Sequence, residues 1–186
     1  AEVISGMSLD EFFKKRIFEP LGMKDTYFLV PKEKATRLVN LYREDSTGKL
    51  VKATGNMLNG KTITPNYPLE ASTYYSGGAG LSSTIYDYAV FLQMLLNNGM
   101  YNGKRILSRN AVRMMTMNQI GDLSRGDDKF GLGFQVVTER GSARIPAQAG
   151  TFSWGGAFAT SYWVDPKEKI VMLFYRQLQN TTKGEV

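Results

Sequence analysis

Hydrophobic residues change their spacing near residue 120, and this change limits the fold more than any other feature of the sequence. Before it, apolar residues recur with the period of a helix; after it, short apolar runs alternate with turn residues. Helices first and strands last predict an α+β fold and not a Rossmann alternation. We expect one partial domain over 1–186, mainly helical with a hairpin in 1–120 and with three antiparallel strands in 121–186.

The first predicted helix spans 8–18. Ser8 is its expected N-cap, and Glu11 is placed to complete a capping box. Pro20 and Gly22 should end it, because proline favours an extended predecessor and glycine favours the end of a helix.

Two further helices follow capping residues in the same way. One begins at Ser83 or Thr84, after a glycine-rich turn, and the other runs from the cap Ser108 to about Met117. The apolar face of the earlier helix is expected to hold Tyr88, Phe91, Leu92, Leu95 and Leu96.

Three strands are predicted to form an antiparallel meander, at Gly133–Thr138, about Phe152–Val164, and Ile170–Tyr175. The last is apolar without alternation, so both of its faces should be covered. An earlier hairpin is predicted from two extended runs, Leu38–Tyr42 and Leu50–Ala53, on either side of an Asp-Ser-Thr-Gly turn. The polar end of the chain, 179–186, shows no helix pattern.

The chain has no cysteine and no histidine. This excludes disulfides, thiol nucleophiles, Cys/His zinc sites and hydrolases with a histidine base, so we expect no metal and no cofactor. Covalent catalysis would have to use Ser or Thr activated by Lys, Tyr or a carboxylate. The lack of cysteine slightly favours an exported protein, periplasmic or secreted.

The net charge is +6, but the basic residues usually have acidic neighbours. A solvated surface therefore explains them better than a nucleic acid partner does. No run is apolar enough to span a membrane. The triplet Arg125-Gly126-Asp127 lies in a polar segment and is interpreted as turn chemistry.

Three segments carry a family resemblance: Phe18–Thr26, Gly77–Thr84 with the helix that ends at Leu95–Gly99, and Trp154–Ala157 ahead of Trp163–Pro166. In this order and at these spacings, the chain resembles the serine β-lactamase-like hydrolases, which include class C β-lactamases, D-Ala-D-Ala carboxypeptidases and carboxylesterases. The resemblance runs from Ser5 to about Gln177. It implies a β-lactamase-like fold, with helices packed on an antiparallel sheet, of which this chain would be the C-terminal part.

The resemblance also implies a serine hydrolase that acts on esters, amides or β-lactams through an acyl-enzyme. The family uses an S-x-x-K helix, a Y-x-N loop and a third motif on a strand, which is Trp-Gly-Gly in an esterase-like group. Only the third motif is present, as Trp154-Gly155-Gly156. These residues are implied to contact the substrate, and the N–H of Ala157 is implied to donate to the oxyanion. Gly78 and Ala79 are implied to line the same pocket.

Each of these assignments has a structural alternative. Trp154 could be packed within the sheet, and the glycine-rich segment could serve only to turn the backbone. A phosphate-binding loop is disfavoured, because neither G-x-G-x-x-G nor a Walker motif is present.

The one S-x-x-K string, from Ser46 to Lys49, falls in the predicted hairpin turn and is interpreted as turn residues. No Tyr-x-Asn is present. The nucleophile and general base are therefore expected in an N-terminal segment absent from this chain, which alone should be inactive. Its partners would be a small-molecule substrate and either a second copy or the complementing segment. The alternative is a non-catalytic remnant that binds a ligand or peptide.

Overall fold

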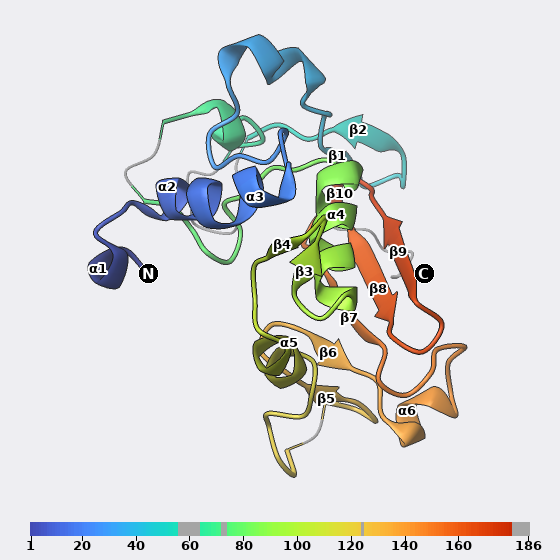
Figure 1. Ribbon diagram of the computed structural model, residues 1–186. Helices are drawn as coiled ribbons and strands as arrows, with labels where there is room; N and C mark the ends of the chain where they lie inside the picture. Colours follow the sequence, from blue (N-terminus) through green and yellow to red (C-terminus); the bar gives the residue numbers. More distant parts are fainter. Residues whose placement is uncertain (56–63, 72–73, 124, 180–186) are drawn as a thin grey trace.

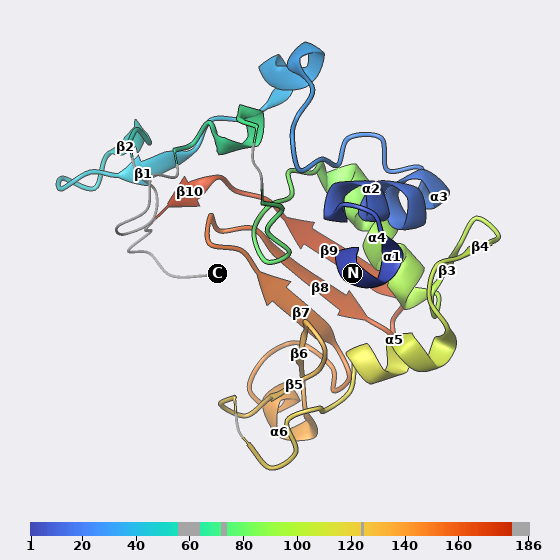
Figure 2. The ribbon, with the colours of Figure 1, turned by 90° about the vertical axis from the view of Figure 1, so that its left-hand side faces the viewer.

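A five-stranded antiparallel sheet with helix α4 (Ile85–Leu96) on one face forms the centre of the molecule (Figures 1 and 2). The computed structural model describes residues 1–55, 64–71, 74–123 and 125–179. The N-terminal helices lie on the side of α4 that faces away from the sheet. The predicted α+β class is confirmed, whereas the polar end at 180–186 lies outside the described residues.

Each strand of this sheet pairs with the next one in the chain, so the predicted antiparallel meander is confirmed. The strands are β5 (Lys129–Phe130), β6 (Gln135–Val136), β7 (Phe152–Gly155), β8 (Ser161–Asp165) and β9 (Ile170–Phe174).

The prediction of three strands was wrong, because the run expected as one strand, 152–164, is two. A tight turn separates the two strands. The N–H of Gly156 donates to the carbonyl oxygen of Thr160 at 2.8 Å, and the N–H of Ala159 donates to the carbonyl oxygen of Gly156 at 3.0 Å. Ala159 has a φ of 64°, a left-handed conformation that alanine rarely adopts, so the turn has no sequence signal there. The short strand β5, which pairs with β6, supplies the remaining difference.

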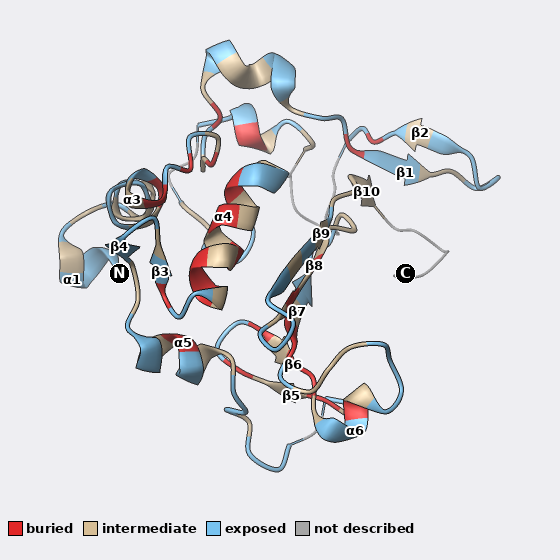
Figure 3. Cartoon of the chain, turned by 45° about the vertical axis from the view of Figure 1, so that its right-hand side comes forward, coloured by how far each residue is buried: buried red, intermediate tan, exposed pale blue. Residues whose placement is uncertain are grey.

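The core lies between α4 and one face of the sheet (Figure 3). Residues directly opposite each other in an antiparallel pair share a face. The row Val136, Phe152, Val164 and Val171 faces α4. From α4 come Leu92, Met94 and Leu95, which are 0–1% exposed. Burial of each such side chain contributes about 1.5–3 kcal/mol, so this layer holds the sheet in place.

Local capping explains where the helices begin. The hydroxyl of Thr84 accepts the N–H of Asp87 at 3.2 Å, and that of Ser108 accepts the N–H of Ala111 at 3.0 Å. Both predicted starts are confirmed, and the latter helix is α5 (Arg109–Met115).

The first predicted helix begins after Ser8, as predicted, but its capping hydrogen bond and its end differ. Ser8 makes no side-chain cap; instead, Glu2 accepts the N–H of Leu9 at 2.8 Å. Pro20 lies within the last turn, and Gly22 ends the helix with a φ of 71°. The segments are α1 (Glu2–Ser5), α2 (Leu9–Phe13), a π-helical turn (Lys14–Phe18) and α3 (Glu19–Leu21).

The predicted hairpin is confirmed, although its first strand begins at Tyr42 and not at Leu38. Its strands are β1 (Tyr42–Glu44) and β2 (Leu50–Lys52), and β10 (Leu178–Gln179) pairs with β1 in parallel. The remaining elements are 3-10 helices at Lys32–Arg37 and Tyr67–Leu69, the pair β3 (Met100–Tyr101) and β4 (Lys104–Arg105), and α6 (Glu139–Ser142).

Strand β9 is covered on one face only, within the part of the chain that the structure describes. Val171 and Leu173 pack against the core, whereas Ile170, Met172 and Phe174 are about half exposed. The prediction that both faces are covered is therefore wrong for these residues. Among the described helices, none is long and apolar enough to cross a membrane.

Candidate functional site

The third-motif residues lie at an open edge of the sheet. Strand β6 pairs with Phe152 and Ser153 only, so Trp154 and Gly155 pair with β8 alone. Gly156 and Ala157 follow in the tight turn to β8. The backbone on the β6 side of Trp154–Ala157 is thus accessible, which a strand in the middle of a sheet would not permit.

Ala157 carries a free peptide N–H at this edge. The N–H of Gly156 points toward β8, where Thr160 accepts it, and no atom of the described chain accepts the N–H of Ala157. Ala157 is exposed. A fixed donor without an internal partner can bind a ligand oxygen without first breaking a bond.

Position 156 has little room for a side chain. A Cβ added there would lie 2.3 Å from the hydroxyl oxygen of Thr160. A larger residue would push this side chain aside and disturb the turn that presents Ala157.

A hollow of about 380 Å³ adjoins this edge. Gln135, Ser153 and Trp163 form one row across β6, β7 and β8, on the face opposite to the core. The hollow therefore runs from the outer face of the sheet around the edge of β7. Its lining comprises Arg125, Gln135, Ser153, Trp154, Gly155, Gly156, Ala157, Ser161 and Trp163.

Trp154 belongs partly to the packing and partly to the hollow. Its ring meets that of Phe130 edge to face, with centroids 5.0 Å apart, and the guanidinium carbon of Arg125 lies 4.6 Å from the Trp154 centroid. The side chain remains 38% exposed. Both expected roles are thus compatible with its position, since the ring packs against Phe130 and Arg125 and also lines the hollow.

The glycine-rich segment lies elsewhere. Gly78 and Ala79 are exposed and do not line this hollow, so their part in substrate binding stays a prediction. Gly80 is the close-packed residue, since an added Cβ would lie 2.6 Å from the carbonyl oxygen of Ser76 and 2.8 Å from the ring of Phe28.

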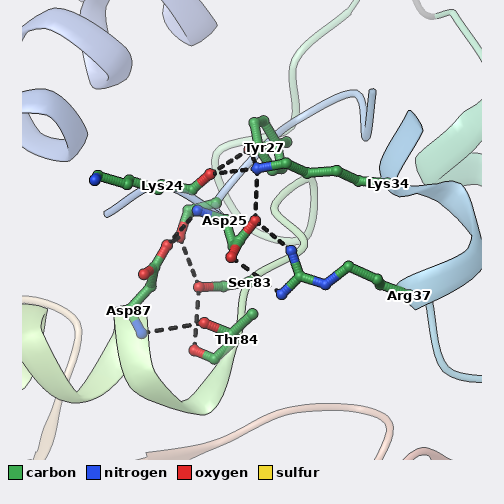
Figure 4. Close-up of polar contacts among 9 residues, drawn as sticks. Lys24, Asp25, Tyr27, Lys34, Arg37, Ser83, Thr84 and Asp87 are labelled. Carbon is green, nitrogen blue, oxygen red and sulfur yellow. Dashed lines mark hydrogen bonds and ion pairs between the residues drawn. The ribbon is translucent and has the colours of Figure 1, made fainter. Parts of the chain in front are cut away.

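A polar network joins two of the resemblance segments, as Figure 4 shows. The buried carboxylate of Asp87, in the first turn of α4, accepts the hydroxyl of Thr26 at 2.9 Å and the N–H of Asp25 at 2.7 Å. The carboxylate of Asp25 pairs in turn with Arg37 and Lys34, each at 2.7 Å. Hydrogen bonds from these two cations lower the pKa of Asp25 to about 2.

This network is structural. It holds the end of the first helical segment against α4, and reciprocal backbone bonds between Tyr27 and Ser82 extend the contact to the glycine-rich segment. The Gly-Met-Lys-Asp-Thr residues thus fix a loop to a helix.

The S-x-x-K string lies in a surface turn, as predicted. The carboxylate of Asp45 accepts the N–H groups of Thr47 and Lys49, at 2.9 and 3.0 Å, which closes the turn. Ser46 and Lys49 are both exposed, and no hydrogen bond joins their side chains.

The hollow also holds two residues to which sequence analysis gave no part in the site: Arg125, which was interpreted as a turn residue, and Gln135, which was not singled out. Arg125 and Asp128 bridge one turn and Gln135 lies on β6, so no local motif marks the contacts among these three residues. Among the described residues, no group of three Asp or Glu side chains is placed to hold a metal ion.

Comparisons with known proteins agree with this fold. The family profile of Beta-lactamase matches residues 1–185. An uncharacterized protein of Mycobacterium tuberculosis is 31% identical over 190 residues, which cover 94% of this chain and 44% of that protein. An Escherichia coli K12 protein named "Putative D-alanyl-D-alanine carboxypeptidase" is 27% identical over 177 residues, which cover 87% of this chain and 37% of that protein.

Among solved structures, EstCE1, described as a hydrolase with promiscuous acyltransferase activity, superposes with a TM-score of 0.82 at 24% identity. The match covers 96% of this chain and 48% of EstCE1. The chain therefore spans less than half the length of the relatives it matches.

Proposed function

The chain belongs to the Beta-lactamase family, and from this premise we propose that it supplies the oxyanion-binding strand of a serine hydrolase that cleaves esters, amides or β-lactams through an acyl-enzyme. The observation that carries the proposal is the N–H of Ala157, which has no acceptor among the described residues and lies at an open sheet edge beside a hollow.

The reaction would place negative charge on the carbonyl oxygen of the substrate when a serine attacks it. A backbone N–H that is already oriented stabilises this charge without reorganisation, and loss of one such donor typically lowers kcat by about 10²–10³-fold. The turn from Gly156 to Thr160 fixes the peptide of Ala157 for this role.

The attacking serine would come from a different segment. Ser153 and Ser161 line the hollow, but neither hydroxyl is hydrogen-bonded to a lysine or tyrosine within the described chain. An unactivated hydroxyl is a weak nucleophile at neutral pH. The S-x-x-K and Y-x-N motifs of the complete enzyme would supply both groups.

Trp154 favours esters over β-lactams in this proposal. The residue occupies the first position of the third motif, where it puts an aromatic ring in place of the lysine of many family members. The carboxypeptidase name of the Escherichia coli relative favours amides, whereas the hydrolase name of EstCE1 covers esters, amides and β-lactams alike.

A non-catalytic binding role is the second candidate. It is favoured by the hollow itself, which is formed within this chain without any activated nucleophile.

Hydrolysis of p-nitrophenyl acetate and butyrate and of a chromogenic cephalosporin tests the proposal. The 186-residue chain should not exceed a heat-denatured control, whereas a longer protein that joins it to an S-x-x-K segment should release a burst of p-nitrophenol and carry a mass increase of one acyl group. Turnover by the chain alone would revive Ser46 with Lys49. A longer protein that folds, binds ester and is never acylated would favour the binding role.

A further inference from the structure

Arg125 is a cation without an acidic partner at the hollow. The nearby carboxylate of Asp127 pairs instead with Arg140 and Arg144, at 2.7 and 2.6 Å. No carboxylate of the described chain forms an ion pair with Arg125, although the residue lines the hollow. The positive charge of Arg125 is therefore not neutralised from within this part of the molecule.

A chain of hydrogen bonds orients this guanidinium. The buried carboxylate of Asp128 accepts the amide N–H of Gln135 at 2.7 Å, which turns the amide oxygen of Gln135 toward Arg125. That oxygen accepts the Nε–H of Arg125 at 3.1 Å. Among the described residues, this is the only acceptor of a hydrogen bond from the guanidinium, so the two terminal nitrogens are available to donate to a ligand.

Two aromatic rings contact the guanidinium of Arg125. The guanidinium carbon lies 4.6 Å from the ring centroid of Trp154 and 5.8 Å from that of Phe130. Contact with these rings reduces the rotational freedom of the guanidinium that a ligand would otherwise have to restrict. Arg125 is thus preorganised, which distinguishes it from an ordinary exposed arginine.

We propose that Arg125 determines specificity by binding a carboxylate of the ligand, so that the hollow selects acyl compounds with an anionic group. The two terminal nitrogens present parallel donors that match the two oxygens of a carboxylate, and the Trp154 ring lies beside them to contact the carbon chain. The proposal deepens the proposed function, because it names the substrate class of the same site.

Ligand binding by the 186-residue chain tests this without any hydrolysis. The only two tryptophans of the sequence, Trp154 and Trp163, both line the hollow, so intrinsic fluorescence reports on it directly. The probes are monomethyl glutarate, which is an anion at pH 7, and the neutral dimethyl glutarate. They are titrated at low ionic strength, where exposed charges are least screened.

Monomethyl glutarate should bind at least about tenfold more tightly than the diester, as one charge-assisted hydrogen-bonded pair implies. Arg125→Gln should abolish this preference, so that the monoester and the diester bind equally tightly, while Arg109→Gln, on an exposed arginine outside the hollow, should preserve it. Arg125→Lys should keep only part of the preference for the monoester, since an ammonium lacks the paired donors of a guanidinium. Circular dichroism must show that all variants keep the wild-type fold.

Equal affinities for the two esters, or a preference that survives Arg125→Gln, would overturn the proposal. Equally tight binding of inorganic phosphate, lost in Arg125→Gln, would assign a general oxyanion site and overturn carboxylate selectivity. Because no catalytic serine is involved, these outcomes do not depend on whether the acyl-enzyme proposal is right.

Discussion

The hydroxyl of Thr26 donates to the buried carboxylate of Asp87 at 2.9 Å and lies 2.7 Å from the hydroxyl of Ser83, so one small side chain connects the first helical segment to the start of α4. Thr26→Val keeps the shape of the side chain but removes the hydroxyl that donates to the Asp87 carboxylate. We expect a loss of about 1–3 kcal/mol in the free energy of unfolding.

Urea denaturation of Thr26→Val measures this loss. Thr54→Val, at an exposed threonine, serves as the control and should change the midpoint very little. Equal midpoints for the two variants would mean that the network contributes nothing to stability.

The ion pairs of Asp25 should make the stability of the fold depend on pH in the acid range. Its pKa is lowered from 3.8 to about 2 by hydrogen bonds from Arg37 and Lys34, so the ionised form is favoured in the folded state. A lowered carboxyl pKa contributes stability that is complete above the unfolded value and is lost as pH falls through the folded value. We therefore expect the wild type to lose its advantage over Asp25→Asn between about pH 5 and pH 2.

Urea midpoints of both proteins across this range provide the measurement. The difference should be modest and should shrink in high salt, because the Arg37 side chain is 56% exposed. A difference that stays constant down to pH 2 would contradict the assignment to Asp25.

Gly80 and Gly78 offer a matched pair in the glycine-rich segment. Gly80→Ala would place a Cβ 2.6 Å from the Ser76 carbonyl oxygen and 2.8 Å from the Phe28 ring, whereas Gly78→Ala meets open space. The former should cost about 1–3 kcal/mol, as overpacking usually does, and the latter should be nearly neutral. Thermal melting distinguishes them; comparable losses would show that this segment packs differently in solution.

The outer face of β9 should promote association. Ile170, Met172 and Phe174 are 52%, 55% and 48% exposed, and β9 has a partner strand on one side only within the described sheet. We expect the chain to self-associate, or to bind a complementing segment, in a way that Met172→Lys weakens. Leu123→Lys, at a residue outside this sheet that is 72% exposed, should have no such effect. Sedimentation over a hundredfold dilution that shows a stable monomer would contradict this.

Local chemistry explains which features of the fold could be predicted from the sequence. The caps at Thr84 and Ser108 were predictable because a hydroxyl bonds an N–H only three residues away. The β7–β8 turn was missed because Ala159 adopts a positive φ that normally signals glycine, and because apolar residues continue through it. The pairing of β10 with β1 joins residues over 130 positions apart, which no local pattern encodes.

The candidate site likewise has parts that could be predicted from the sequence and parts that could not. The third motif was found because its residues are adjacent in sequence, and the turn interpretation of the triplet at 125–127 agrees with the bridge between Arg125 and Asp128. The hydrogen bonds from Asp128 through Gln135 to Arg125 depend on how two short strands fold together, so composition and spacing gave no sign of them.

The central claim, that the N–H of Ala157 binds the oxyanion, is tested by Ala157→Pro in a protein that joins this chain to its S-x-x-K segment. Proline removes this one donor, and Ala157 occupies the second position of the turn from Gly156 to Ala159, where proline is readily accommodated. Ala157→Ser keeps the N–H and is the control. Circular dichroism and thermal melting first confirm that both variants are folded.

Steady-state hydrolysis of p-nitrophenyl butyrate by these folded variants is the decisive measurement. The proposal predicts that Ala157→Pro lowers kcat by about 10²–10³-fold with a smaller change in KM, while Ala157→Ser stays close to the parent. A folded Ala157→Pro variant that keeps kcat within about threefold of the parent, well short of the loss of one donor, would show that Ala157 is not the oxyanion donor.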